Sequence, residues 1–300
     1  MLVGMTPASV TRAPDPSYRH VLLPLDGSDL AAGAAETARA LAVRFGADVQ
    51  TVSVSPSAAE TDALRRHAAE VLDTDPSDVR LHVAVEDDPA RAIHRLAEDL
   101  GSCLVCISTH GRGRVAGAVI GSVARSVLQL GGAPIVAVGP FADRPSALGA
   151  EKTAPLSVNQ LVACVDGGGP SEQVLPVAAA WAHALGMSLA VVTVAEPSPP
   201  PLRTDATWHR HHGPQADAEE YLRQLGEKWH DVAPDVRTHV VYDPISAAEG
   251  IKAHLDAQPT GLVAVTTHGR TGLNRVVFGA GAAGIVHAST APVLVVPLVE

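Results

Sequence analysis

The sequence predicts an α/β protein made of two tandem Rossmann-like, doubly wound domains, each with a five-stranded parallel sheet in the order 3-2-1-4-5. Three observations lead to this fold class. Short apolar runs without strict alternation, typical of strands covered on both faces, take turns with helical patterns. A glycine-rich turn occurs twice, and matching features recur 140 to 158 positions apart.

The glycine-rich turns follow an apolar run and precede a helical segment in both copies. The first contains Ser108, His110, Gly111 and Arg112, and nine residues later it reaches Gly121 and Ser122. The second contains Thr266, Gly269 and Arg270, and after the same interval it reaches Gly279 and Ala280. A strand, a glycine turn and a helix in this order are typical of a phosphate-binding site.

The strands of the two halves correspond one to one. The first strands span 21–26 and 161–166 and both end on Asp-Gly, at Asp26-Gly27 and Asp166-Gly167. The later strands are expected at 48–55, 79–83, 103–107 and 134–138, and again at 188–196, 236–240, 262–265 and 292–296.

Helices are expected between all of these strands. The first pair ends at Gly46 and Gly186, a residue type that suits the position after a helix. The third pair is entered through Asp-Pro, which favours a helix start, and the last pair spans 122–130 and 280–287.

The domain boundaries follow from these elements. We expect a disordered tail over 1–17, a first nucleotide-binding domain over 18–140, a linker over 141–157 and a second nucleotide-binding domain over 158–300. A proline- and histidine-rich insert over 198–214 in the second half is expected to be an exposed loop.

Composition argues against several classes of protein. The net charge is −10 and no block of basic residues occurs, which disfavours nucleic acid as a partner. No apolar run approaches the length of a membrane span, and the first 17 residues lack the apolar core of a secretory signal, so we expect a cytoplasmic protein with no membrane partner.

Cys103 and Cys106 have a C-x-x-C spacing, but on a strand they point to opposite faces, which favours core positions over a metal or redox site.

The doubly wound order brings the ends of the first and fourth strands together, where such sheets bind ligands. Asp26 is expected to accept hydrogen bonds from a ribose or an adenine amino group, and Val54 to meet the base through its backbone. The N–H groups of Gly111 and Gly121 are expected to approach phosphates, Ser122 to donate its hydroxyl to one, and Arg112 to add a charged contact. The remaining candidate nucleotide contacts flank these positions in both halves: Pro24, Leu25, Gly27, Val123, Val165, Gly167 and Val194.

Other interpretations of these residues stay open. Asp26 also suits a helix N-cap. His110 and His268 invite a catalytic role, although shaping the turn is the simpler one. The histidines at 209, 211 and 212 could bind a metal, but a solvated loop explains them better. We therefore expect no catalytic residue and no metal site on the protein.

These residues resemble the universal stress protein family in its tandem form. The family motif is a glycine, two residues, a glycine, nine residues and then Gly-Ser or Gly-Thr, and positions 108–122 are similar to it, as are Asp26-Gly27-Ser28 and the Ala-Pro pairs before the last strands. The resemblance covers about residues 18–140 and 158–298. It implies binding of ATP, alone or with Mg²⁺, no defined reaction, a regulatory role under stress, and dimerisation through the fifth strands.

In a tandem chain this pairing becomes an intramolecular pseudo-dimer, and a further homodimer and an unknown regulatory protein partner are expected. The chain departs from the family at Ser108 and Thr266, which replace the first glycine, and at Ala280, which replaces the serine of the first copy. Losing a hydrogen bond to a charged phosphate costs on the order of 1–3 kcal/mol. We therefore predict two nucleotide sites, the second weaker.

Two other functions remain as alternatives. One is a weak ATP hydrolase or a nucleotidyl-transfer enzyme, although the P-loop Gly-Lys-Ser/Thr motif is missing and none of the three lysines lies in a glycine turn. The other is a scaffold that binds no nucleotide, which the motif of the first copy disfavours.

Overall fold

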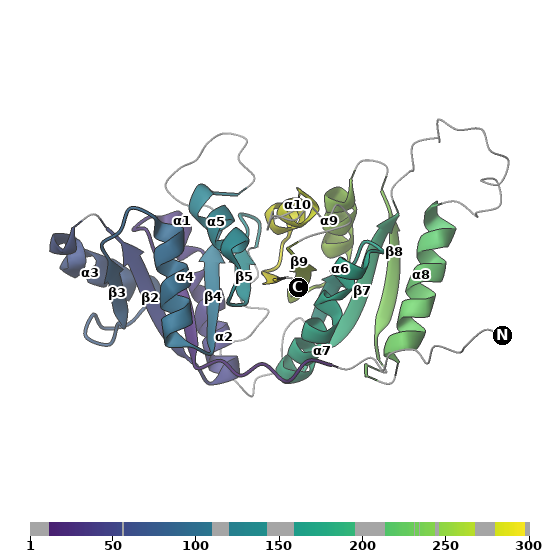
Figure 1. Cartoon of the computed structure of the whole chain (residues 1–300), viewed down its shortest axis with the longest axis horizontal. Helices are drawn as coiled ribbons and strands as arrows, with labels where there is room; N and C mark the ends of the chain where they lie inside the picture. Colours follow the sequence, from purple (N-terminus) through teal and green to yellow (C-terminus); the bar gives the residue numbers. More distant parts are fainter. Residues whose placement is uncertain are drawn as a thin grey trace, which may run out of the picture.

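The computed structural model describes residues 12–55, 57–109, 120–142, 159–195, 214–230, 232–233, 235–243, 246–267 and 280–297. Its strands form one ten-stranded sheet in the order β3-β2-β1-β4-β5-β10-β9-β6-β7-β8, with the two halves of the chain side by side (Figure 1). Each half therefore has the predicted order 3-2-1-4-5, and all strand pairs within a half are parallel.

The first half contains five strands with helices between them. The strands are β1 (His20–Pro24), β2 (Asp48–Val54), β3 (Leu81–Ala84), β4 (Cys103–Ser108) and β5 (Ile135–Val138). The helices are α1 (Asp29–Ala32), α2 (Ala35–Phe45), the 3₁₀ turn η1 (Ala58–Glu60), α3 (Thr61–Leu72), α4 (Pro89–Leu100) and α5 (Ser122–Leu130).

The second half repeats this arrangement. Its strands are β6 (Gln160–Cys164), β7 (Ser188–Ala195), β8 (Arg237–Tyr242), β9 (Leu262–Thr266) and β10 (Val293–Val296). Its helices are α6 (Gly169–Glu172), α7 (Val174–Leu185), α8 (Pro214–Trp229), α9 (Ala247–Ala257) and α10 (Ala280–Ala288).

Local differences from the sequence prediction have identifiable causes. The first helix of each half is interrupted, between α1 and α2 and between α6 and α7. Gly33 lies at the first break, and glycine weakens a helix. At the second break, Pro176 has no backbone N–H, so it cannot make the hydrogen bond that would join α6 and α7. Helix α9 starts at Ala247 rather than at the Asp-Pro pair, because the side chain of Ser246 caps it by accepting the N–H of Glu249 at 3.2 Å.

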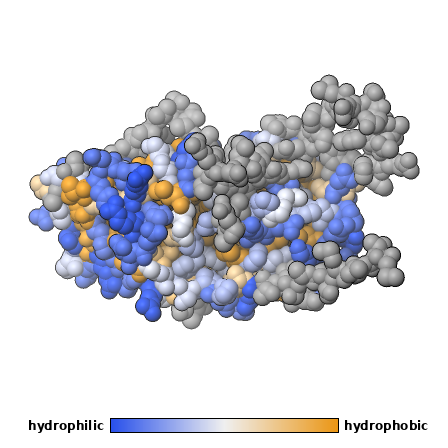
Figure 2. All heavy atoms as spheres, in the orientation of Figure 1, coloured by the Kyte–Doolittle hydropathy of each residue, from blue (hydrophilic) through white to orange (hydrophobic). Residues whose placement is uncertain are grey.

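Helices cover both faces of the sheet. Buried residues of α2, α3, α7 and α8 form one hydrophobic cluster, and those of α4, α5, α9 and α10 form another on the opposite face. Cys106 belongs to the first cluster and Cys103 to the second, so the C-x-x-C pair does not converge. Burial raises the pKa of the Cys103 thiol to about 11, so the residue stays a neutral thiol near neutral pH and is a poor nucleophile or metal ligand. On the face seen in Figure 2, polar side chains cover much of the described surface of the first half.

The two halves join through an antiparallel pair of strands, β5 and β10. Val136 lies opposite Leu294, and these residues occupy equivalent positions of the repeat, 158 apart. Ile135 lies opposite Val295 and Ala137 opposite Val293, so a pseudo-twofold axis passes through the central pair. The expected intramolecular pseudo-dimer is therefore the observed arrangement.

A second contact between the halves involves the N-terminal segment. The rings of Tyr18, Phe45 and Trp181 meet at centroid distances of 5.0–5.7 Å, so the end of α2 packs against α7. The N–H of Ala13 donates to the carbonyl of Pro176 at 3.2 Å. Residues 12–17 run from beside α7 toward the first half (Figure 1), and residues 1–11 lie outside the described part.

Gly139, just after β5, provides a test of the joint between the halves. A Cβ at this position would collide with the backbone carbonyl oxygen of Val286 in α10. We expect Gly139→Ala to lower the free energy of unfolding by about 1–3 kcal/mol, as overpacking does. Chemical denaturation measures this loss.

The control is Gly281→Ala, because nothing lies within 4 Å of a Cβ built there. That variant should be as stable as the parent or slightly more so, since alanine favours the helix. Equal stability of the two variants would contradict the close approach.

Two half-buried histidine pairs predict a pH dependence of stability. Burial, and then the neighbouring His239, lower the pKa of His254, whose ring centroid lies 5.2 Å from that of His239. Burial and then His20 lower the pKa of His82 in the same way. Because the folded state disfavours protonation, the stability present above the ordinary value of 6.5 is lost as the pH falls through the lowered values.

Replacing His254 with leucine, which stands at the equivalent position 96, removes one of these groups. We expect His254→Leu to flatten the fall in unfolding free energy between about pH 7 and pH 5. The same substitution at the exposed His230 is the control. A slope unchanged by His254→Leu and by its control alike would refute the assignment.

Candidate functional site

A cavity of about 280 Å³ opens at the carboxyl ends of β1, β2 and β4 in the first half. Its wall is mostly apolar, and its polar atoms come from the strand ends and from the start of α5. The lining residues are Pro24, Leu25, Asp26, Ala31, Val52, Val54, Pro89, Ile93, Ile107, Ser108, Thr109, Gly121, Ser122, Val123 and Ala124. The cavity thus lies at the predicted crevice, where the winding of the sheet reverses.

The turn after β1 fixes the position of Asp26. Its Oδ1 accepts the backbone N–H of Ser28 at 3.0 Å and the Ser28 hydroxyl at 2.6 Å. Gly27 adopts a φ of +78°, which favours glycine at this tight turn. The Ser28 hydroxyl oxygen in turn accepts the N–H of Ala31 at 3.2 Å, so Ser28 rather than Asp26 caps α1. The Asp-Gly-Ser sequence therefore presents a carboxylate at the edge of the cavity.

Gly121 has a different role from the one expected. Its N–H donates to the carbonyl of Thr109 at 2.8 Å and is therefore not directed at a ligand. A Cβ at this position would lie 3.2 Å from the same carbonyl oxygen, so the close approach favours glycine. Thr109 is itself fully buried and its N–H donates to Val138 at 3.0 Å. Gly121 thus ties the start of α5 to the end of β4.

The first turn of α5 supplies the donors that the site can use. Ser122 and Val123 are exposed and line the cavity. A helix offers no internal acceptor to the N–H groups of its first turn, and its dipole favours an anion there. A phosphate at this position would meet backbone N–H groups and the Ser122 hydroxyl.

Several predicted residues cannot be compared with the structure. His110, Gly111 and Arg112 lie outside the described residues, as do Gly269, Arg270 and Gly279 of the second copy. So do His268 and the histidines of the 198–214 insert.

Sequence reasoning missed the wall that α4 contributes. Pro89 and Ile93 line the cavity opposite Val52 and Val54 of β2. Asp88 caps α4 by accepting the N–H groups of Ala90 and Arg91, at 3.1 and 3.2 Å. The Asp-Pro pair in the sequence could have indicated this wall, because it marks the start of the helix, and that start lies near the carboxyl edge of the sheet.

The second half keeps the turn after β6 but changes its chemistry. Gly167 again adopts a positive φ, of +81°, and Oδ1 of Asp166 accepts the N–H of residue 168 at 2.9 Å. Residue 168 is glycine, so the hydroxyl that Ser28 supplies in the first half is missing. The Ser171 hydroxyl instead accepts the N–H of Asp166 at 3.1 Å and donates to the carbonyl of Gly168 at 2.7 Å.

The other candidate residues of the second half occupy matching places. Thr266 is buried at the end of β9, Val165 follows β6, and Val194 lies near the end of β7. Helix α10 begins at Ala280, without the hydroxyl of Ser122.

A polar cluster found only in the second half adjoins this turn. Glu172 accepts the Tyr221 hydroxyl at 3.3 Å and lies 3.4 Å from the Lys228 ammonium group. Burial, and then the charges of Glu172 and Asp166, raise the pKa of Tyr221. The equivalent residues of the first half are apolar: Ala32, Leu64 and Val71.

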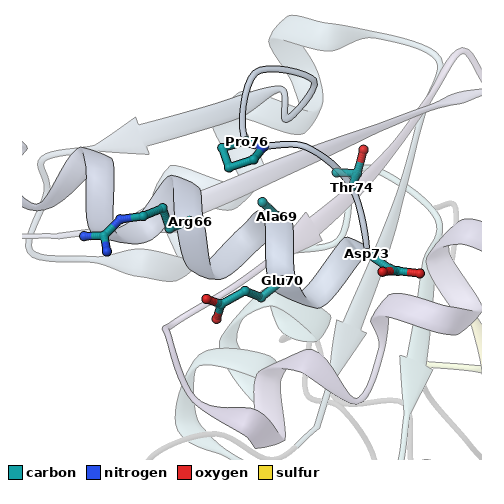
Figure 3. A pocket seen from close by; sticks show the side chains of 6 residues that line it. All are labelled: Arg66, Ala69, Glu70, Asp73, Thr74 and Pro76. Carbon is teal, nitrogen blue, oxygen red and sulfur yellow. The ribbon is translucent and has the colours of Figure 1, made fainter.

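A second hollow, of about 350 Å³, lies on the surface at the end of α3. The charged side chains of Arg66, Glu70 and Asp73 point in different directions around it (Figure 3). These side chains do not point toward a common centre, and the hollow lies away from the carboxyl ends of the strands. We therefore place the candidate site at the first cavity.

The described residues contain neither a membrane-spanning helix nor a cluster of metal-ligating side chains. No helix in this part of the chain is long and apolar enough to cross a membrane. Within the same residues, no three or more histidine, cysteine, aspartate or glutamate side chains gather where they could hold a metal ion.

Comparisons with known proteins agree with the repeat. The model of the universal stress protein family matches residues 17–139 and 158–297. A functionally unknown protein from Pseudomonas aeruginosa PAO1 is 15% identical, with 94% of each chain covered and a TM-score of 0.63. A universal stress protein from Archaeoglobus fulgidus DSM 4304 is 15% identical, with 93% of this chain and 98% of that chain covered and a TM-score of 0.60.

A shorter universal stress protein, solved in complex with cAMP, is 24% identical. The match covers 41% of this chain and 97% of that one, with a TM-score of 0.35. None of the curated proteins matches the chain.

Proposed function

The chain belongs to the universal stress protein family, and we propose that it binds ATP in the crevice of its first half and acts as a regulatory protein under stress. The proposal also includes a second, weaker nucleotide site in the other half, a further homodimer and a regulatory protein partner. Its cellular compartment would be the cytoplasm.

One observation carries the proposal: an apolar pocket, a carboxylate and a helix N-terminus line a single cavity. The pocket between β2 and α4 suits a planar base, because Val52, Val54, Pro89 and Ile93 line it. Asp26 suits the ribose hydroxyls, which are hydrogen-bond donors. The start of α5 suits the phosphates.

The residues present would hold Mg²⁺ only through the nucleotide. Since the described residues contain no cluster of three metal-ligating side chains, we propose that the ion arrives coordinated by the phosphates. Ser122, at the start of α5, has a hydroxyl group on the cavity wall that suits the phosphates or such an ion.

The composition of the cavity favours binding over catalysis. Among the described residues that line it, Asp26 is the one ionisable side chain. General acid–base chemistry requires a group whose pKa and position suit proton transfer, and a single carboxylate turned toward the ribose does not supply it. We therefore prefer a nucleotide-dependent regulator to a weak ATP hydrolase or a nucleotidyl-transfer enzyme.

The second site is proposed to be weaker because it lacks two hydroxyl groups. Gly168 replaces Ser28, and Ala280 replaces Ser122. The sequence retains Asp166, Gly269, Arg270 and Gly279, so the elements for the ribose and part of the phosphate contacts persist.

Exchanging the residues at the helix starts tests the proposal. We expect Ser122→Ala to weaken the stronger ATP site about tenfold, and Ala280→Ser to strengthen the weaker one by a similar factor. Asp26→Ala should weaken the first site alone. Isothermal titration calorimetry with ATP and Mg²⁺ measures both affinities.

The matched control is Ser126→Ala, which makes the same change one turn further along α5 and away from the cavity lining. Two equal sites in the parent protein, or the same loss in Ser126→Ala and Ser122→Ala, would count against the proposal. Steady-state ATP turnover above buffer that Asp26→Ala abolishes would favour the enzyme instead.

A further inference from the structure

Helix α9 approaches β7 more closely than an ordinary residue at position 250 would permit. A Cβ built on Gly250 would lie 2.9 Å from Cγ1 and 3.2 Å from Cγ2 of Val194. It would also lie 3.0 Å from Cβ of Asp243. Real Cβ contacts below 3.0 Å essentially do not occur, so this packing depends on glycine.

The first half has an ordinary side chain at the same place. The equivalent of Gly250 is Ala92, a buried residue of α4 that carries a methyl group where Gly250 has none. The equivalent of Val194 is Val54 at the end of β2. The two halves thus differ by one methyl group in the helix that faces this valine.

The two valines also have different surroundings. Val54 lines the 280 Å³ cavity together with Pro89 and Ile93 of α4. Val194 instead packs against the hydrophobic cluster that contains Ile251 and Leu255 of α9. The cavity therefore opens beside Val54 in the first half, whereas Val194 of the second half lies against the backbone of α9 at Gly250.

We infer that Val194, seated on Gly250, closes the base-binding side of the second crevice and is the residue that determines its selectivity. This inference rests on the proposed function and adds, to the two missing hydroxyl groups, a further reason why the second site is weaker. Asp166 remains as a contact for a ribose, whereas Val194 fills the part that would receive a purine. Restoring the lost hydroxyl with Ala280→Ser therefore recovers only part of the difference between the two sites.

Truncating Val194 tests the inference in solution. In a chain that also carries Asp26→Ala, so that the heats report the second crevice, Val194→Ala should raise the affinity for ATP about tenfold. Its affinity for ribose 5-phosphate should stay the same, because that probe has no base.

The control is Val241→Ala, which truncates the neighbouring residue on β8, packed against the same hydrophobic cluster. Unchanged ATP affinity in Val194→Ala, or an equal rise in Val241→Ala, would overturn the inference.

A stability measurement decides the packing independently of any nucleotide. Gly250→Ala should lower the melting temperature, and adding Val194→Ala should recover most of that loss, since the colliding methyl groups are then gone. If Gly250→Ala is as stable as the parent, the inference fails even if ATP binds. If the parent binds no ATP in either crevice, the proposed function fails, and the double variant still tests whether Val194 fills the space.

Discussion

The antiparallel pairing of β5 with β10 is the interaction on which the rest of the molecule depends. It joins two five-stranded parallel sheets into one, and equivalent residues, Val136 and Leu294, face each other at its centre. The same geometry brings Gly139 against α10 and the end of α2 against α7. Strand pairing and side-chain packing therefore hold the two halves in one fixed arrangement.

Within this symmetric frame the two halves have diverged in chemistry. The first half presents a carboxylate, a capping serine, an open apolar pocket and a serine at the helix start. The second half has glycine or alanine at both serine positions, and α9 closes on Val194. It has gained a polar cluster around Glu172 where the first half is apolar.

The sequence predicted the strand order, the repeat and most of the first cavity, because these follow from patterns along the chain. Asp26 lies in the turn after β1, Val54 and Ser108 end strands, and Ser122 begins a helix. The parallel order of the sheet brings such positions together. The walls from α4 and α9 were not predictable in this way, because the distance between a helix and a sheet depends on side chains far apart in sequence. The close approach of Gly250 to Val194, for example, joins residues 56 positions apart in the sequence. The hydrogen bond from the Gly121 N–H to the carbonyl of Thr109 likewise could not be predicted from the spacing of the glycines in the sequence.

Counting the nucleotides bound to each chain tests the central claim most directly. Native mass spectrometry of the intact protein, titrated with ATP and Mg²⁺, resolves chains that carry none, one or two nucleotides. The account predicts that the singly occupied chain dominates over a wide range of ATP concentration and that the doubly occupied chain appears only at a clearly higher one. Chains that fill both crevices together, or that stay empty throughout, would contradict one complete site and one depleted site in a fixed pair.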